Sequence, residues 1–382
     1  MIKILFITTG LTTGGAEMML YKLLSRIDRN RFEPVVVSLL RTDCFGDRIV
    51  SKISALNIPI YSLDMNPGEF KLQKLLKLLN LIHKEQPDIL QGWMYHANLA
   101  AQLANFLTIK SLPTIWNIRH SLYSLDYEKK GTAAIIRLLS KISNFSNRII
   151  YNSQIGALQH QKIGYKSDKT IVIPNGFDID LFQPSTKNKS DLRQELNLPH
   201  DAFLIGRICR YHPMKDHDSF FKAAALLLKD FPQLYFVLAG TDVDENNSHL
   251  NSVINQLSIG DRVYLLGERK DVSRLTSALN IAVSSSYFGE AFPNVIGEAM
   301  ACEVPCVVTD VGDSASIVGD TGKIVPPKNP QALADSCKEL ISLNVESRQE
   351  LGRKARQKIV EFYSLDAVVA EYEKLYYNAL GK

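Results

Sequence analysis

Short apolar runs alternate with longer amphipathic segments along the whole chain. The runs are typical of buried strands, and segments whose apolar positions recur every three or four residues are typical of helices. In the first half, the runs predict strands at residues 2–9, 32–39, 58–62, 89–91, 114–117, 148–151 and 170–173. The amphipathic segments predict helices at 15–25, 70–85, 95–107 and 131–143.

The same alternation continues after a break near residue 177. Ile173-Pro174-Asn175-Gly176-Phe177-Asp178 is typical of a hinge, and the polar segment 183–188 with its proline is interpreted as a linker. Strands are predicted at 202–209, 234–240, 263–266, 281–284 and 304–309, with helices at 218–230, 247–257, 271–278, 294–302 and 330–343. Strands that alternate with helices indicate an α/β fold with parallel sheets.

The chain has 382 residues, which fits two domains. We therefore predict two Rossmann-like, doubly wound parallel-sheet domains that face each other across a cleft. In such sheets, ligands bind at the carboxyl ends of the strands.

Composition indicates a water-soluble globular protein, with 46% apolar and 22% charged residues. No apolar run is long enough to cross a membrane. The first nine residues lead directly into a glycine-rich turn and are interpreted as a strand rather than a signal peptide. A cytoplasmic location is expected.

The net charge of +4 is unevenly distributed. Residues 1–185 hold 22 Lys and Arg against 14 Asp and Glu, a balance of +8, and the remainder holds 22 against 26, a balance of −4. A positive first half favours an anionic partner such as a phosphate-bearing acceptor or a membrane surface. An incidental surface bias is the simpler alternative. No nucleic-acid-binding motif accompanies the charge, so nucleic acid is not expected as a partner.

A resident metal ion is not expected. Cys302 and Cys306 are four residues apart, but no second Cys or His pair lies near them in the sequence. Two Asp-x-Asp strings, 178–180 and 242–244, fall in turn-rich segments and are interpreted as turn or cap residues.

The first candidate motif is the glycine-rich segment 9–17, between the first strand and the first helix. Gly14 and Gly15 let the backbone approach a phosphate, and the start of a helix favours negative charge. A purely structural turn remains open for this segment taken alone.

The second motif follows the first strand of the second domain. Arg210 and Lys215 are five residues apart on a strand-to-helix loop, where they can converge on one anion. Arg offers a planar fork for a diphosphate and Lys a point charge. Two solvated cations are the alternative.

The third motif, residues 284–300, is the most informative. Glu290 and Glu298 are eight residues apart in an apolar setting, and sugar or ribose hydroxyls are suitable partners for such carboxylates. The backbone of Phe292, Pro293 and Asn294 lies at the predicted helix start and can face an anion.

Together these motifs resemble the family 4 glycosyltransferases, a retaining group with the GT-B fold of two Rossmann-like domains. The resemblance covers essentially the whole chain. It includes Glu-x7-Glu at 290–298, GGAE at 14–17, His120 in WNIRHS, IPNGFD at 173–178, Arg210 with Lys215, and LGERKDV at 266–272.

The resemblance implies a role for each residue. Glu290 would hold the sugar hydroxyls of a nucleotide diphosphate donor, and Glu298 the ribose. Arg210 and Lys215 would bind the diphosphate, with help from amides around Gly15. His120 would contact the donor sugar, and the backbone near Arg269 would meet the base.

The implied domains are residues 1–177 for the acceptor and 178–365 for the nucleotide sugar, with a helix at 366–382 that packs back on the first domain. The implied activity is retaining, metal-independent hexosyl transfer, with UDP as the expected donor base. The implied acceptor is a glycan or a polyprenyl-diphosphate-linked saccharide of surface polysaccharide synthesis, such as lipopolysaccharide.

The predicted helix 70–85 carries lysines on one face and leucines on the other. Such a helix can lie on an anionic membrane surface, which would make the protein peripheral on the inner face of the membrane. The simpler account is a helix that packs its leucines on the sheet. Both remain open.

Two other functions remain open. A nucleotide-sugar epimerase or hydrolase can use the same fold, because fold alone does not decide activity. A sugar-nucleotide sensor or inactive partner subunit is the alternative without catalysis.

Overall fold

The computed structural model describes residues 1–12, 14–42, 48–68 and 71–381. The chain forms two compact units, and each is considered by itself. The first unit comprises Met1–Gly176 together with Leu365–Lys382, and the second comprises Phe177–Ser364. The carboxyl-terminal segment therefore belongs to the first unit.

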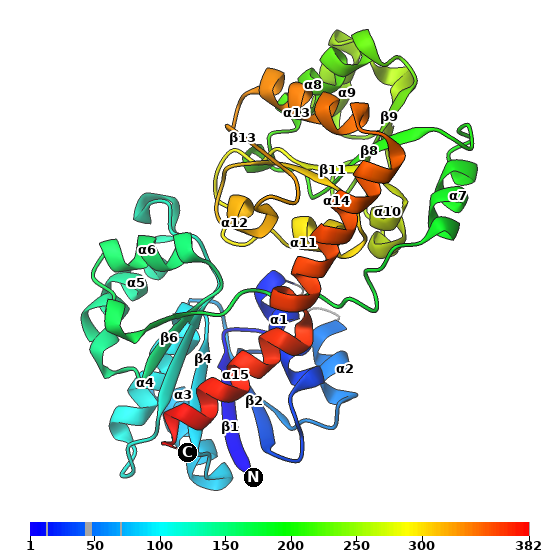
Figure 1. Cartoon of the computed structure of the whole chain (residues 1–382). Coiled ribbons are helices and arrows are strands. Elements are labelled where there is room, and N and C mark those ends of the chain that lie inside the picture. The colour runs from blue at the N-terminus through cyan, green and yellow to red at the C-terminus, as the bar shows by residue number, and fades with distance from the viewer. Residues whose placement is uncertain (13, 43–47, 69–70, 382) are drawn as a thin grey trace. The chain divides into compact units, whose positions relative to one another are not determined.

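A seven-stranded parallel sheet forms the centre of the first unit, in the order β3-β2-β1-β4-β5-β6-β7 (Figure 1). Its strands are β1 (Ile2–Thr8), β2 (Phe32–Leu40), β3 (Ile60–Met65), β4 (Ile89–Trp93), β5 (Thr114–Ile118), β6 (Arg148–Tyr151) and β7 (Thr170–Val172). Ile4 and Phe6 belong to the core on one face of this sheet, and Leu5 and Ile7 to the core on the other. Burial on both faces explains why β1 is a continuous apolar run.

Helices cover both faces of this sheet. The core of one face includes residues of α1 (Gly15–Arg26), α2 (Arg48–Ser54) and α15 (Leu365–Ala379). The other face is covered by α3 (Leu72–Glu85), α4 (Tyr95–Leu107), α5 (Lys130–Ile142) and α6 (Gln154–Lys162).

The second unit has a six-stranded parallel sheet in the order β10-β9-β8-β11-β12-β13. Its strands are β8 (Phe203–Ile208), β9 (Leu234–Ala239), β10 (Val263–Leu265), β11 (Ile281–Ser284), β12 (Cys306–Thr309) and β13 (Lys323–Val325). Its helices are α7 (Thr186–Glu195), α8 (His217–Asp230), α9 (Ser248–Gln256), α10 (Val272–Ala278), α11 (Asn294–Ala301), α12 (Ser314–Val318), α13 (Pro330–Ser342) and α14 (Val345–Lys358), and α14 continues into a π-helical turn at Ile359–Tyr363.

Both sheets reverse their strand order once. In the first unit the reversal lies between β1 and β4, and in the second between β8 and β11. The loops that follow two such strands diverge to opposite sides, which leaves room for a ligand at the carboxyl edge. The predicted α/β class and the two parallel sheets are confirmed.

Several predicted elements differ in detail. The segment interpreted as a linker, 183–188, contains the start of α7, which the Ser185 side chain caps by accepting a hydrogen bond from the Asn188 amide. The helix predicted at 70–85 is described from Leu72 onward, and Phe70 lies outside the described residues. No helix in the described part of the chain is both long and apolar enough to cross a membrane.

The helix α15 is held to the first unit by buried polar contacts as well as by packing (Figure 1). The Tyr372 hydroxyl accepts hydrogen bonds from Asn117 Nδ2 and Arg119 Nη1, both at 2.8 Å. Arg119 is buried, and its guanidinium also donates to Asn175 Oδ1 and lies over the Trp93 ring. Burial lowers the pKa of Arg119, while its contact with Tyr372 opposes this. The hydrogen-bond acceptors that stabilise this buried guanidinium are therefore neutral side chains.

We predict that Tyr372→Phe destabilises the first unit by about 1–3 kcal/mol, because two buried donors, one of them charged, lose their acceptor. The chain has two tryptophans, Trp93 and Trp116, and both lie in this unit. Tryptophan fluorescence during urea unfolding therefore follows this unit.

Tyr377→Phe is the matched control. It lies on the same helix, and its hydroxyl accepts from the exposed Arg31, so its loss leaves water as a replacement. If both variants lowered the free energy of unfolding equally, the buried hydrogen bonds of Tyr372 would not be the source of the stabilisation.

Candidate active site

Two predicted residues from distant parts of the second unit meet at the carboxyl edge of its sheet. Lys215 ends the loop after β8, and Glu290 lies in the loop after β11. Lys215 Nζ is 2.5 Å from Glu290 Oε1, and Ser286 Oγ donates to the same oxygen at 2.7 Å. Glu290 is buried, so both contacts offset the cost of removing its carboxylate from water.

The two loops are held together by further contacts. The Tyr287 amide donates to the Met214 carbonyl at 2.7 Å. Gly289 has a positive φ of +74°, and a Cβ there would lie 2.9 Å from Met214 Cε. The positive φ favours glycine directly before Glu290, whereas the flexible end of Met214 could move away from a Cβ.

Arg207, which is not among the predicted site residues, also links the loops after β8 and β11. It is buried in β8 and donates to the Asp216 carbonyl at 3.0 Å and to Ser285 Oγ. Neither acceptor is charged, so the loop lies above a buried positive charge. The signal available in the sequence was an arginine inside an otherwise apolar strand.

A pocket of about 390 Å³ lies beside this junction. It brings together four predicted residues, namely Arg210, Arg269, Asn294 and Glu298. Arg210 is exposed and makes no side-chain hydrogen bond or ion pair with any residue that the structure describes. Arg210 thus remains available to an anion, whereas Lys215 is already paired.

Gly240 explains how the Arg210 loop is positioned. Its φ is +152°, and a Cβ there would lie 2.1 Å from the Cys209 carbonyl oxygen and 2.8 Å from the Arg210 nitrogen. Only glycine allows the backbone at the end of β9 to approach the backbone of Cys209 and Arg210 so closely. Its position in the sequence predicts only the end of a strand and does not indicate this close approach.

The Arg269 side chain is committed to structure. Its guanidinium donates to both carboxylate oxygens of Asp271 at 2.9 Å and to Glu195 Oε1 at 2.8 Å. These hydrogen bonds raise the pKa of Arg269 and lower the pKa of Asp271. These contacts fix the position of residue 269, whose backbone lies beside the pocket.

The start of α11 contributes backbone rather than side chains. Phe292 is buried and stacks on Phe177 with ring centroids 6.0 Å apart. Pro293 has no N–H group, so it offers no backbone donor at the start of α11.

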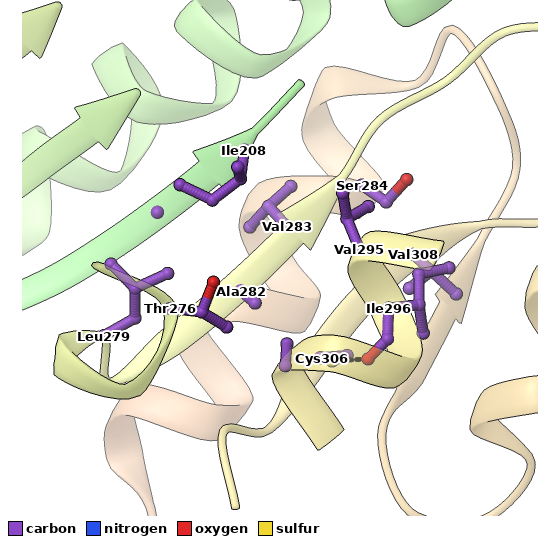
Figure 2. Close-up of a pocket in the computed structure, with 12 residues that line it drawn as sticks. Ile208, Thr276, Leu279, Ala282, Val283, Ser284, Val295, Ile296, Cys306 and Val308 are labelled. Atoms are coloured by element: carbon purple, nitrogen blue, oxygen red, sulfur yellow. Dashed lines mark hydrogen bonds between the residues drawn. The ribbon is translucent and has the colours of Figure 1, made fainter. Parts of the chain in front are cut away.

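Packing beneath α11 supports this loop. Figure 2 shows apolar side chains from β11, β12 and α11, including Val283, Val308 and Ile296, around a small interior space. The Cys306 thiol donates to the Ile296 carbonyl at 3.8 Å. None of the predicted site residues lines this space, so it serves as scaffold.

His217 begins α8 directly behind the Lys215 loop. Burial, with Arg207 and Lys215 nearby, lowers the pKa of His217 to about 2, so it stays neutral. Its Nε2 lies 3.7 Å from Cys209 Sγ. Its Nδ1 has no hydrogen-bond partner within the described part of the chain.

The remaining predicted residues, Gly14, Gly15 and His120, belong to the first unit. Gly14 is the extended residue before α1, and Gly15 begins the helix with open space around its Cα. Trp93 at the end of β4 donates its Nε1–H to the Ala16 carbonyl at 2.9 Å, which ties the helix start to the sheet.

His120 ends a chain of hydrogen bonds that sets its tautomer. His160 Nδ1 faces the Gly156 carbonyl at 2.7 Å and must carry the proton, so its Nε2 accepts from the Tyr95 hydroxyl at 2.7 Å. Tyr95 has no second proton, so its oxygen accepts from His120 Nδ1 at 3.3 Å. The neutral His120 then presents an unprotonated Nε2, which lies 3.6 Å from Glu128 Oε1. Burial lowers the pKa of His120, and Glu128 partly opposes this.

The Asp-x-Asp strings make turn contacts. Asp178 Oδ1 accepts from the amides of Asp180 and Leu181, and Asp244 Oδ1 accepts from Asn246. Burial raises the pKa of the Cys302 and Cys306 thiols to about 12. Cys44 lies outside the described residues. Over the described ranges, no cluster of three or more His, Cys, Asp or Glu side chains has the arrangement of a metal site.

Both halves of the chain match known glycosyltransferase families. Residues 13–181 match the family described as Glycosyltransferase Family 4, and residues 188–358 match the family described as Glycosyl transferases group 1. The chain is 32% identical over 343 residues to N-acetyl-alpha-D-glucosaminyl L-malate synthase of Bacillus anthracis, with 88% of this chain and 84% of that protein covered.

Two further comparisons agree. The chain is 28% identical over 316 residues to the capsular polysaccharide biosynthesis glycosyltransferase CapM of Staphylococcus aureus, covering 80% of each. It superimposes on the crystal structure of Anabaena Alr3699/HepE in complex with UDP with a TM-score of 0.85, over 99% of this chain and 100% of that one, at 23% identity. The predicted GT-B fold is confirmed.

We predict that acid destabilises the first unit through His160. Burial lowers the pKa of His160 from 6.5 to about 4. Above pH 6.5 the residue is neutral in both the folded and unfolded chain. Between pH 6.5 and 4 the unfolded chain binds a proton that the folded chain does not. The free energy of unfolding therefore decreases as the pH is lowered through this range, by about 3 kcal/mol in total.

Urea unfolding followed by tryptophan fluorescence at pH 7 and pH 4 measures this fall. His160→Gln should show a smaller fall than the wild type, because its side chain does not titrate. An equal fall in both proteins would show that other groups cause the acid sensitivity.

Proposed function

The chain belongs to the family 4 glycosyltransferases, and we propose that it transfers a hexose from a UDP-sugar to a glycan or lipid-linked acceptor, with retention of the anomeric configuration. The observation that carries the proposal is the Lys215–Glu290 contact beside the pocket that Arg210 and Glu298 line. It places two cations and two carboxylates at one edge of the second sheet.

The charges suit a nucleotide diphosphate. Arg210, which pairs with none of the described residues, and the buried charge of Arg207 favour an anion at the loop after β8. The proposal adds the backbone at the start of α11 as a further contact to this anion. The proposal assigns the diphosphate to Arg210 and Lys215, the ribose to Glu298, and the base to the backbone at Arg269. UDP is supported as the base by its presence in the Anabaena structure.

Glu290 is suited to the sugar itself. One of its oxygens is held by Lys215 and Ser286. The fixed carboxylate can then accept hydrogen bonds from two sugar hydroxyls without further ordering. The family resemblance gives His120 a contact with the same sugar, and its unprotonated Nε2 is suited to accept a hydroxyl proton in a hydrogen bond.

Retention follows from attack on the face that the diphosphate leaves. The bond between the anomeric carbon and the phosphate oxygen breaks, and the acceptor oxygen bonds to the same carbon. The acceptor proton passes to an oxygen of the leaving phosphate. The protein then has to stabilise the charge on that diphosphate, and the proposal gives this role to Arg210 and Lys215 in place of a metal ion.

The proposal extends to surface polysaccharide synthesis in the cytoplasm, at the inner face of a membrane that carries the acceptor. The name of the CapM relative supports this role.

Nucleotide release tests the activity. The protein is incubated with UDP-, GDP- and ADP-sugars, EDTA and a lipid-linked acceptor extract. We expect UDP release that requires the acceptor and persists in EDTA, with an α-linked product from an α-linked donor. Release without acceptor would indicate a hydrolase, and return of an altered nucleotide sugar would indicate an epimerase. Activity lost in EDTA and restored by manganese would reject metal independence.

In the same assay we expect Arg210→Ala and Lys215→Ala each to lower turnover at least about tenfold, because each removes a donor to the leaving diphosphate. Lys222→Ala, an exposed lysine on α8, is the matched control and should retain full turnover. Near-wild-type turnover in both loop variants, with unchanged circular dichroism, would reject the diphosphate assignment.

A further inference from the structure

Arg207 of β8 is a buried cation that no carboxylate pairs with among the described residues. It is 2% exposed, and its side chain contacts the Asp216 carbonyl, the Ser285 hydroxyl, the Cys209 thiol and the Phe220 ring. A guanidinium that is removed from water without a counter-charge lowers stability relative to an apolar side chain of similar size. Packing of the core therefore does not explain why β8 carries an arginine at this position.

The contacts of Arg207 converge on the end of the loop that carries Lys215. Arg207 Nη1 donates to the Asp216 carbonyl at 3.0 Å and to Ser285 Oγ. The buried hydroxyl of Ser285 faces the Asp216 carbonyl at 2.9 Å and the Lys215 carbonyl at 3.4 Å. One side chain from β8 and one from the residue after β11 thus hold the backbone of residues 215 and 216.

The backbone at Asp216 has a conformation that depends on its surroundings. Its φ is +50° and its ψ is 63°, in the left-handed region that residues other than glycine rarely adopt. Its side chain begins α8 by accepting a hydrogen bond from the Ser219 amide at 3.2 Å. A change in the backbone angles of Asp216 would turn Lys215, the residue before it, relative to the sheet.

The loop that carries Lys215 is held at three successive carbonyls. The Met214 carbonyl accepts from the Tyr287 amide at 2.7 Å, and the next two carbonyls face Ser285 and Arg207. Lys215 Nζ then lies 2.5 Å from Glu290 Oε1. The placement of this ammonium therefore depends on contacts that the Lys215 side chain itself does not make.

We propose that Arg207 and Ser285 are positioning residues for Lys215. They affect the diphosphate of the donor through the Lys215 ammonium and do not touch it themselves. The inference rests on the proposed function, which assigns Lys215 to this diphosphate, and it extends the site to two residues behind it. An apolar side chain could fill the space of Arg207, but it could not donate to the Asp216 carbonyl and to Ser285.

A double-mutant cycle in UDP affinity tests this, measured by calorimetry on the whole chain. We expect Arg207→Met to weaken UDP binding at least about fivefold when Lys215 is present, and less than about twofold in the Lys215→Ala variant, because Arg207 then has no ammonium to position. Equal weakening in both backgrounds would mean that Arg207 acts independently of Lys215, which overturns the proposal. Unchanged UDP binding in Arg207→Met alone would overturn it as well.

Ser285→Ala tests the same role with a smaller change, which keeps the proposal testable if Arg207→Met does not fold. We expect UDP binding at least about threefold weaker when Lys215 is present, and no further loss in the Lys215→Ala variant. Ser277→Ala is the matched control, because Ser277 is also buried in the second unit but donates to the Arg274 carbonyl, at 3.1 Å. It should change UDP affinity less than about twofold. Equal effects in the two serine variants would overturn the role of Ser285.

Arg193→Met is the matched control for Arg207→Met. Arg193 is also buried in the second unit, and it donates to the carbonyls of Ala202 at 2.9 Å and Lys189 at 2.7 Å. We expect this variant to lower the midpoint of urea unfolding followed by circular dichroism, and to change UDP affinity less than about twofold. If both arginine variants weakened UDP binding equally, general destabilisation would account for the effect and the positioning role would be rejected.

Nucleotide release separates this inference from the proposed function, because UDP binding can be measured without an acceptor. Coupling between Arg207 and Lys215 in UDP affinity, without release from any donor, would support the positioning role and remove the transferase activity. Acceptor-dependent UDP release without such coupling would keep the activity and overturn the positioning role.

Discussion

The parallel pairing of β8 with β11 is the constraint on which the candidate site depends. Ile205 and Gly206 of β8 lie opposite Ile281 and Ala282 of β11, so both strands end at the same edge. Because the strand order reverses between them, their loops diverge and leave space for a ligand. Lys215 and Glu290 are 75 residues apart in the chain, and they meet because each lies in one of these two loops. The ion pair follows from the topology, and Ser286 helps to offset the cost of burying its carboxylate.

The three cations near this edge differ in whether a carboxylate pairs with them. Lys215 is neutralised by Glu290, whereas Arg207 is buried among neutral acceptors and Arg210 extends into the pocket without a partner among the described residues. Backbone geometry holds this arrangement, since Gly240 admits the Arg210 loop at a distance that any side chain would prevent. Lys215 and Glu290 are already held by hydrogen bonds, which lowers the cost of ordering these two side chains when a ligand binds.

The first unit has the same type of sheet but a different chemistry at its strand ends. Its glycine-rich turn is tied to the sheet by Trp93, and hydrogen bonds through Tyr95 and His160 set the tautomer of His120. Beside them lies a cavity with apolar walls and lysines. The strand ends of the second unit therefore carry paired and unpaired charges, whereas those of the first carry a histidine network and a cavity with mainly apolar walls.

The sequence by itself determined the alternation of strands and helices, the two sheets and the positions of the motifs, because each of these depends on neighbours along the chain. Local pattern failed at β13, which has three residues, and at α14, whose buried positions include Gly352 and Ala355 rather than large apolar side chains. Only the tertiary structure decided that Lys215 pairs with Glu290, that Arg269 is committed to Asp271 and Glu195, and that Tyr372 accepts from Arg119, 253 residues away. These contacts depend on strand order and side-chain packing, which spacing along the chain does not record.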